Sequence, residues 1–123
     1  MKVSKIKAVK QDTASPEEDI LSVSKKMKLN KSIVVLEKKK PVGIITMRDI
    51  VARVLSKGKD PKKTLAKEIM TTPVFCVKEN EEIENIMKTM IEKDYLTVPV
   101  IDKKGYYKGI ITLRQMIGLI KKK

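Results

Sequence analysis

Two kinds of hydrophobic pattern recur along the chain, each of them twice. Short runs rich in β-branched residues predict two pairs of strands, and a polar turn separates the strands of each pair. These runs are residues 32–36, 42–45, 96–101 and 107–111. Apolar residues at helical spacing predict one helix before each pair and another after it, over about 47–57 and 113–121.

The start of each half predicts a short lead strand followed by a capped helix. The lead strands are expected at 6–9 and 74–77. Ser15 is a suitable N-cap for the first helix, with Glu18 completing a capping box. Asn80 is the expected N-cap of the corresponding helix in the second half. Each half is therefore predicted to run strand, helix, strand, strand, helix.

A self-match shows that the two halves are copies of one unit. Gly-Ile-Ile-Thr-Met-Arg at 43–48 recurs as Gly-Ile-Ile-Thr-Leu-Arg at 109–114, 66 residues later. The match extends backwards without a gap, so that 34–35 falls on 100–101. A repeat of this length indicates one supersecondary unit used twice, with the two copies burying faces against each other.

These elements predict an α/β (α+β) fold built from two pseudo-symmetric units. The first repeat is expected to span 1–58 and the second 67–123. Residues 59–66 form the polar linker between them.

Composition excludes several classes of chemistry. The 123 residues include no His and a single Cys, Cys76. A Ser-His-Asp or Cys-His catalytic set and a Cys/His zinc site therefore lack their residues, and an internal disulfide is excluded. With no apolar run of about 18 residues and no signal-peptide core, we expect a cytoplasmic protein with no membrane partner and no conventional catalytic activity.

The chain is strongly basic, with 28 Lys and Arg against 15 Asp and Glu and a net charge of +13. Most of the excess lies in residues 1–66. This charge indicates either a surface that attracts a polyanion or a solvated, lysine-rich surface. We favour the solvated surface, because the lysines are dispersed and aromatic residues, at 3%, are too few for a base-stacking platform.

Three blocks of sequence resemble a known family. Gly-Ile-Ile-Thr-Met-Arg-Asp at 43–49, Glu-Ile-Met-Thr-Thr-Pro-Val at 68–74 and Thr-Val-Pro-Val-Ile-Asp at 97–102 are similar to a tandem pair of cystathionine-β-synthase (CBS) domains, the Bateman module. The resemblance implies two units packed through their sheets, with clefts between them that often hold adenosine nucleotides. It also implies dimerisation into a disc-like assembly.

The strand-to-helix junction at Thr46 has the groups that a nucleotide needs. Backbone N–H groups at a helix start, the Thr46 hydroxyl and Arg48 can meet a phosphate, while the Asp49 carboxylate can accept two hydrogen bonds from ribose hydroxyls. The family resemblance implies that Thr46 and Asp49 contact the nucleotide. The expected adenine slot is lined by apolar residues such as Ile6, Ala8, Ile33 and Ile44.

The same residues also fit a purely structural role. Thr-x-x-Asp at a helix start is an N-cap pattern, and Thr112-Leu113-Arg114-Gln115 matches the capping box even better. The two roles are compatible, because an oxygen on the first turn can also face a ligand.

The second copy departs from the first where the ribose would bind. Gln115 stands in place of Asp49, while Thr112 and Arg114 keep their phosphate-binding potential. Hydrogen bonds to charged groups contribute roughly 1.5–3 kcal/mol against about 1 kcal/mol for neutral ones. We therefore expect unequal sites, with the one at Asp49 the tighter.

Three functions remain open at this point. The first is a regulatory module that binds AMP, ADP, ATP or a related adenosyl ligand, requires no cofactor, and acts through a partner protein or its own homodimer. The second is a polyanion-binding protein acting on DNA or RNA. The third is a structural dimer whose clefts are empty. An enzyme is the least supported, because no convincing acid–base or nucleophile pair is present.

Overall fold

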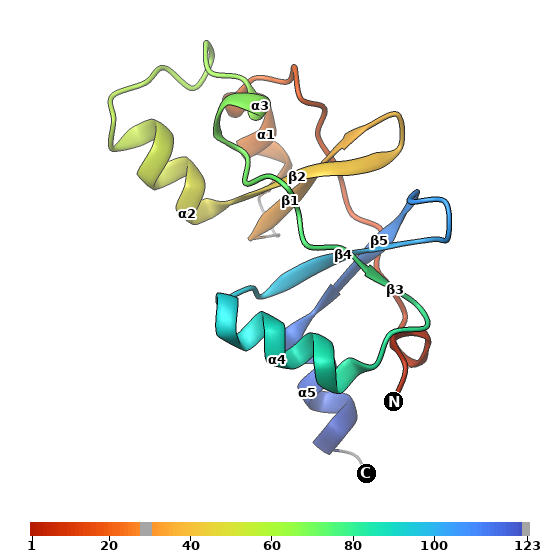
Figure 1. Ribbon diagram of the computed structural model, residues 1–123. Coiled ribbons are helices and arrows are strands. Elements are labelled where there is room, and N and C mark those ends of the chain that lie inside the picture. The colour runs from red at the N-terminus through yellow and green to blue at the C-terminus, as the bar shows by residue number, and fades with distance from the viewer. Residues whose placement is uncertain (28–30, 122–123) are drawn as a thin grey trace. The chain divides into compact units, whose positions relative to one another are not determined.

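The computed structural model describes residues 1–27 and 31–121 and divides the chain into two compact units (Figure 1). The first unit is Asp12–Val74, and the second combines Met1–Gln11 with Phe75–Lys123. Each unit has a small sheet and helices, which confirms the mixed α+β class. Because 1–11 belongs to the second unit, the compact units do not coincide with the two sequence repeats.

The first unit is built on an antiparallel hairpin of β1 (Ser32–Glu37) and β2 (Lys40–Thr46). Lys38 and Lys39 at the turn have φ values of 52° and 68°, as a two-residue turn between twisted strands requires. The other elements are α1 (Ile20–Lys26), α2 (Met47–Ile50), the π-helical segment η2 (Val51–Leu55) and α3 (Ala66–Ile69). The two predicted strands are confirmed.

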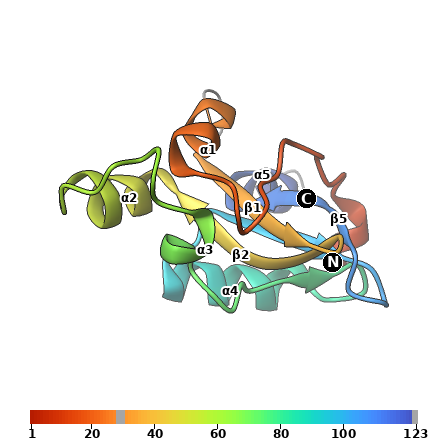
Figure 2. The same cartoon turned by 90° about the horizontal axis from the view of Figure 1, so that it is seen from above.

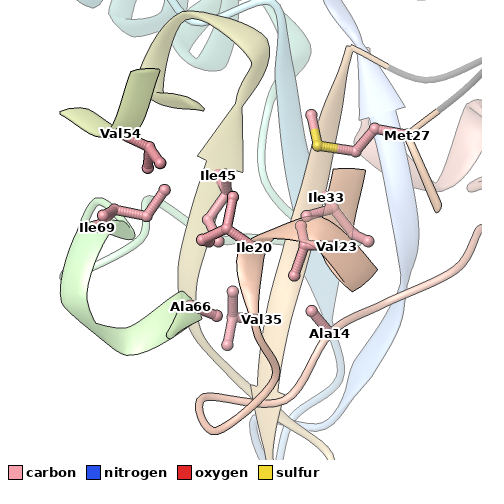
Figure 3. Packing of buried hydrophobic residues seen from close by; sticks show 10 residues of the cluster. All are labelled: Ala14, Ile20, Val23, Met27, Ile33, Val35, Ile45, Val54, Ala66 and Ile69. Carbon is pink, nitrogen blue, oxygen red and sulfur yellow. The ribbon is translucent and has the colours of Figure 1, made fainter. Parts of the chain in front are cut away.

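The core of this unit lies on one face of the hairpin (Figure 3). Ile33 on β1 and its cross-strand partner Ile45 are buried against Ile20 and Val23 of α1. The other buried residues of this cluster are Val35 on β1, Met27 at the end of α1, Val54 on η2, Ala66 and Ile69 on α3, and Ala14 before α1. Burial of each large side chain contributes about 1.5–3 kcal/mol, so this face holds the unit together.

The second unit has a three-stranded sheet in the order β3-β4-β5, in which β3 is parallel to β4 and β5 is antiparallel to it. Its elements are η1 (Val3–Lys5), β3 (Val77–Lys78), α4 (Ile83–Lys93), β4 (Thr97–Ile101), β5 (Tyr107–Thr112) and α5 (Leu113–Lys121). Helices α4 and α5 (Figure 2) belong to this unit. They contribute Ile83, Ile86, Met90 and Met116 to its core. Helix α5 spans the range predicted for it.

The lead strand predicted at 6–9 is wrong. Val9 instead makes an antiparallel bridge to Ile110 of the second unit. In the first unit, Ala14 takes the place of a lead strand. It forms a parallel bridge to Val35, just as β3 pairs in parallel with β4 in the second unit. A short apolar segment can be recognised from sequence, but its sheet partner is chosen by the tertiary fold.

The ungapped backward match between the repeats is wrong by one residue. Ile33 pairs with Ile45, and Val98 pairs with Ile111. The second strands of the two hairpins are thus 66 residues apart, whereas the first strands are 65 apart. The turn after β4 is one residue longer than the turn after β1. This shift keeps the buried face of each strand on its core, because side chains alternate faces along a strand.

Helix α1 begins later than its capping signals predicted. Its N-cap is Asp19, which accepts a hydrogen bond from the Ser22 backbone N–H at 2.9 Å, so the assignment of Ser15 is wrong. Glu18 does accept a hydrogen bond from the Ser15 N–H, at 3.4 Å, and it also accepts from Lys26 Nζ at 2.9 Å and Ser22 Oγ at 2.7 Å. Glu18 therefore stabilises α1 through the side chains of Ser22 and Lys26.

Two further helix ends can be compared with the sequence prediction: the end of the helix expected at 47–57 and the start of α4. The helix predicted at 47–57 is split into α2 and η2, and the chain leaves it at Gly58, whose φ of 69° suits a C-terminal glycine. Helix α4 has Glu82 at its N-cap position, so the assignment of Asn80 is wrong. The Asn80 carbonyl instead accepts a hydrogen bond from Lys2 Nζ at 3.0 Å.

A glycine in each hairpin allows another segment to cross it closely. A Cβ on Gly43 would lie 2.7 Å from Met70 Cγ, and one on Gly109 would lie 3.0 Å from Ala8 Cβ and from the Val9 carbonyl oxygen. Gly109 also has a φ of 140°, which side chains disfavour. The repeated glycine therefore marks the crossing point in both units.

We expect Gly109→Ala to destabilise the protein by about 1–3 kcal/mol, through backbone strain and contact with Ala8. Thermal or urea unfolding measures this change. Gly118→Ala is the matched control, since a Cβ there meets nothing within 4 Å and Gly118 lies in α5; it should be neutral or stabilising by about 0.5–1 kcal/mol. Equal effects of the two variants would contradict the crossing interpretation.

The Glu18 carboxylate predicts a pH dependence of stability. Burial raises its pKa, but hydrogen bonds from Lys26 and Ser22 outweigh this and bring the pKa below the ordinary value of 4.5. Its stabilising contribution is therefore complete above pH 4.5 and is lost as the pH falls through the lower, folded-state pKa. Urea unfolding of Glu18→Gln should show a deficit at pH 7 that shrinks at pH 3. Glu17→Gln, at an exposed ion pair with Lys67, is the control and should change little at either pH.

Candidate functional site

The first strand-to-helix junction, residues 46–49, is closed by two reciprocal hydrogen bonds. The Asp49 backbone N–H donates to Thr46 Oγ1 at 3.1 Å, and the Thr46 N–H donates to Asp49 Oδ2 at 2.8 Å. The Asp49 side chain is only 13% exposed. The capping role considered from the sequence is therefore present, and it holds the carboxylate in one orientation.

The second junction, residues 112–115, repeats this arrangement with an amide. The Gln115 N–H donates to Thr112 Oγ1 at 3.1 Å, and the Thr112 N–H donates to Gln115 Oε1 at 2.8 Å. The capping box predicted at this position is confirmed. The other end of the amide, Nε2, donates to the Lys7 carbonyl at 3.4 Å. Gln115 therefore uses both ends of its side chain within the second unit.

Arg53 completes the first junction, and sequence reasoning missed it. Its Nε lies 3.7 Å from Asp49 Oδ1, and its Nη1 donates to the Ile69 carbonyl at 2.9 Å. The available signal was the i, i+4 spacing of an acid and an arginine on a predicted helix. At the corresponding position of the second repeat the residue is Leu119.

Each junction faces a crossing segment, 69–71 in the first unit and 7–9 in the second. Thr71 exchanges two backbone hydrogen bonds with Ile44, at 2.9 and 3.1 Å, and Val9 exchanges two with Ile110, at 2.9 and 2.8 Å. The Ile69 and Lys7 carbonyls, each two residues before these bridges, are therefore equivalent. A junction side chain binds this carbonyl in both units.

The structure does not bring all the predicted apolar residues together. Ile33 is buried in the core of the first unit, whereas Ile44, which pairs with Val34, lies on the opposite face of the hairpin and is half-buried. Ile6 and Ala8 are packed against the core of the second unit. Ile33 and Ile44 therefore cannot line one surface, and 6–8 belongs to the same compact unit as the second junction.

The two predicted phosphate-binding arginines are exposed on the first turns of their helices. Arg48 follows Thr46 on α2, and Arg114 follows Thr112 on α5. Each arginine therefore lies in the same unit as the threonine with which it was predicted to act.

In the part of the chain that the structure describes, little supports a metal site, a reactive cysteine or a membrane-spanning helix. Among residues 1–27 and 31–121, His, Cys, Asp and Glu form no group of three that could hold a metal ion. Burial raises the pKa of the Cys76 thiol to about 11, so the group is protonated at neutral pH. Within the same residues, every helix is too short or too polar to cross a bilayer.

Comparison with known proteins identifies the repeat. The family model of the CBS domain matches twice, at residues 4–56 and 66–122. An uncharacterised protein of Methanopyrus kandleri is 36% identical over 108 residues, covering 85% of this chain and 55% of that protein. Inosine-5′-monophosphate dehydrogenase of Methanocaldococcus jannaschii is 30% identical over 127 residues, covering 94% of this chain and 24% of the enzyme. The chain thus spans about half of one relative and a quarter of the other.

A solved structure shows the same fold. The cytosolic domain of the Mg²⁺ channel MgtE, in complex with ATP, superposes with a TM-score of 0.74 at 20% identity and covers 89% of this chain and 44% of that one. The doubled family match, the two capped junctions and the two hairpins agree with one another. The chain belongs to the CBS-domain family and carries two CBS domains in tandem.

Proposed function

We propose that this protein is a regulatory module that binds an adenosine nucleotide, AMP, ADP or ATP, at the first junction. The observation that carries the proposal is the Asp49 carboxylate, which is largely shielded and held by the Thr46 backbone. A carboxylate fixed in this way is a ready acceptor for the two hydroxyls of a ribose. The ATP bound to the MgtE domain supports the class of ligand.

The groups around Asp49 supply the rest of a nucleotide site. The Thr46 hydroxyl accepts from the Asp49 N–H and can donate its own proton to a phosphate oxygen. Arg48, the residue before Asp49, offers a positive charge to the phosphate, since guanidinium groups bind phosphate with charge-assisted hydrogen bonds. Ile44 is the predicted apolar residue within this unit that remains available for the base, because it lies on the face away from the core.

The second junction is proposed as the weaker site. The side-chain carbonyl of Gln115 accepts a hydrogen bond from the Thr112 N–H, and its amide group donates one to the Lys7 carbonyl. A ribose would have to compete with these bonds, and it would meet a neutral group. Thr112 and Arg114 can still contact a phosphate, and Ile6 and Ala8 lie in the same unit. The proposal thus keeps the inequality expected from the sequence.

The regulatory output is proposed to pass through a homodimer or a partner protein in the cytoplasm. Met47, Val51 and Leu55 follow one another at helical spacing along α2 and η2, and each is more than half exposed. An apolar stripe of this kind is typical of an interface. A ligand shifts such an assembly only as far as it binds two packings with different affinity.

The leading experiment is a binding measurement on Asp49→Ala. We expect calorimetry to show AMP or ATP binding weakened about tenfold or more, because a charge-assisted hydrogen bond is lost. Gln115→Ala removes the equivalent side chain of the second repeat and should leave the tighter site unchanged. Unchanged affinity in Asp49→Ala would refute the ribose role.

A ligand screen on the wild-type chain separates this proposal from its alternatives. Adenine nucleotides at millimolar concentration should raise the melting temperature by mass action on the folded state. A gel-shift assay with DNA and RNA at physiological salt runs beside it, because the net charge of +13 favours weak polyanion binding in dilute buffer. Retention of nucleic acid together with no nucleotide response would favour the polyanion reading.

The proposed dimer has its own test. Leu55→Glu places a charge in the apolar stripe and should convert a dimer to a monomer in light scattering, because desolvating an unpaired carboxylate is costly. Ile91→Glu is the control, since Ile91 is 62% exposed but lies on α4. A wild-type chain that is monomeric at high micromolar concentration would contradict the homodimer.

A further inference from the structure

The two junctions solve one structural problem with different chemistry. Each must satisfy a backbone N–H of the threonine and bind the carbonyl of the crossing segment. In the second unit one neutral amide, Gln115, performs both tasks. In the first unit the tasks are divided, because Asp49 accepts from Thr46 and Arg53 donates to the Ile69 carbonyl.

The substitution between the repeats is paired. Where the first repeat has Asp49 and Arg53, the second has Gln115 and Leu119. Both members of the ion pair are replaced at once, and the result has no net charge in either case. The second unit makes the same crossing without an arginine at that position, because Gln115 Nε2 donates to the Lys7 carbonyl.

Because the tasks are divided in the first unit, the two oxygens of the Asp49 carboxylate have different partners. Asp49 Oδ2 is bound by the Thr46 N–H at 2.8 Å, whereas Oδ1 lies 3.7 Å from Arg53 Nε. That distance is an ion-pair distance and exceeds hydrogen-bond range. The guanidinium thus neutralises Oδ1 without occupying the direct hydrogen-bond position, while its other end is held by the Ile69 carbonyl.

From these contacts we propose that Arg53 is a positioning residue that makes the first junction selective for a vicinal diol. It supplies the counter-charge that lets a shielded carboxylate stay at the site, and it keeps Oδ1 aimed at the ligand. The inference rests on the proposed nucleotide function and adds to it the residue that decides between ribose and deoxyribose. Asp49 and Arg53 then act as one unit, and the Gln115–Leu119 pair lacks this selectivity.

A double-mutant cycle tests the coupling, with adenosine and 2′,3′-dideoxyadenosine as the probes. Both probes lack phosphate, so their difference reports the diol alone. The variants are Asp49→Gln, Arg53→Leu and the double variant, which reproduces the pair found in the second repeat. Lys57→Leu is the matched control, because it removes an exposed positive charge shortly after η2.

Arg53→Leu is expected to weaken adenosine binding about tenfold, while dideoxyadenosine binding stays within about twofold of wild type. In the double variant adenosine should bind as it does to Asp49→Gln alone, since coupled residues are not additive. The melting temperature of the double variant should exceed that of Arg53→Leu, because Gln at position 49 carries no charge that needs a partner. Lys57→Leu should retain wild-type discrimination.

Three outcomes would overturn the inference. Arg53→Leu that keeps the preference for adenosine shows that Arg53 has no influence on the diol, and equal loss of both probes shows a general structural role. Additive effects in the cycle show that the two residues act independently. If Arg53→Leu does not fold, Arg53→Gln replaces it, because Gln removes the charge and keeps a hydrogen-bond donor; unchanged discrimination in that variant overturns the inference equally.

The wild-type measurement separates this inference from the function on which it rests. A wild-type chain that binds neither adenosine nor AMP refutes the proposed function and the role of Arg53 together. A wild-type chain that prefers adenosine to its dideoxy analogue supports the function, and the variants then decide about Arg53 alone.

Discussion

The structure depends on a close crossing of two backbone segments over a glycine in each unit. Gly43 and Gly109 lack the side chain that would block Met70 and Ala8. The crossing segments can then exchange paired hydrogen bonds with the second strand of each hairpin. These bonds present a carbonyl to the junction that follows the strand, and a side chain near each junction donates a hydrogen bond to it.

One face of each hairpin packs on the core of its own unit, and the other face carries a different set of residues. Ile33 and Ile45 face the core of the first unit, and Val98 and Ile111 face that of the second. Because strand residues alternate, the positions between them look the other way. The stable core and the candidate binding surface are therefore separate sets of residues on the same strands, and the binding residues can change without loss of the core.

The two junctions show how a repeat diverges under a shared structural requirement. An amide can both donate and accept, so Gln115 alone satisfies the threonine N–H and the opposing carbonyl. A carboxylate only accepts, so Asp49 needs Arg53 to donate in its place. The first junction thus carries a pair of opposite charges that the second does not, and this difference is the physical basis for the unequal sites that we propose.

The sequence by itself determined the repeat, the strand pairs, the helices that follow them and the threonine junctions, because each depends on local spacing and capping chemistry. It misplaced the lead strand at 6–9, shifted one hairpin by a residue and missed Arg53. Only the tertiary structure could decide these features, because long-range packing determines them. It selects the sheet partner of a strand and the length of a turn. It also brings the Ile69 carbonyl to Arg53, sixteen positions earlier in the chain. Local pattern specifies which faces are apolar; the fold specifies what each face meets.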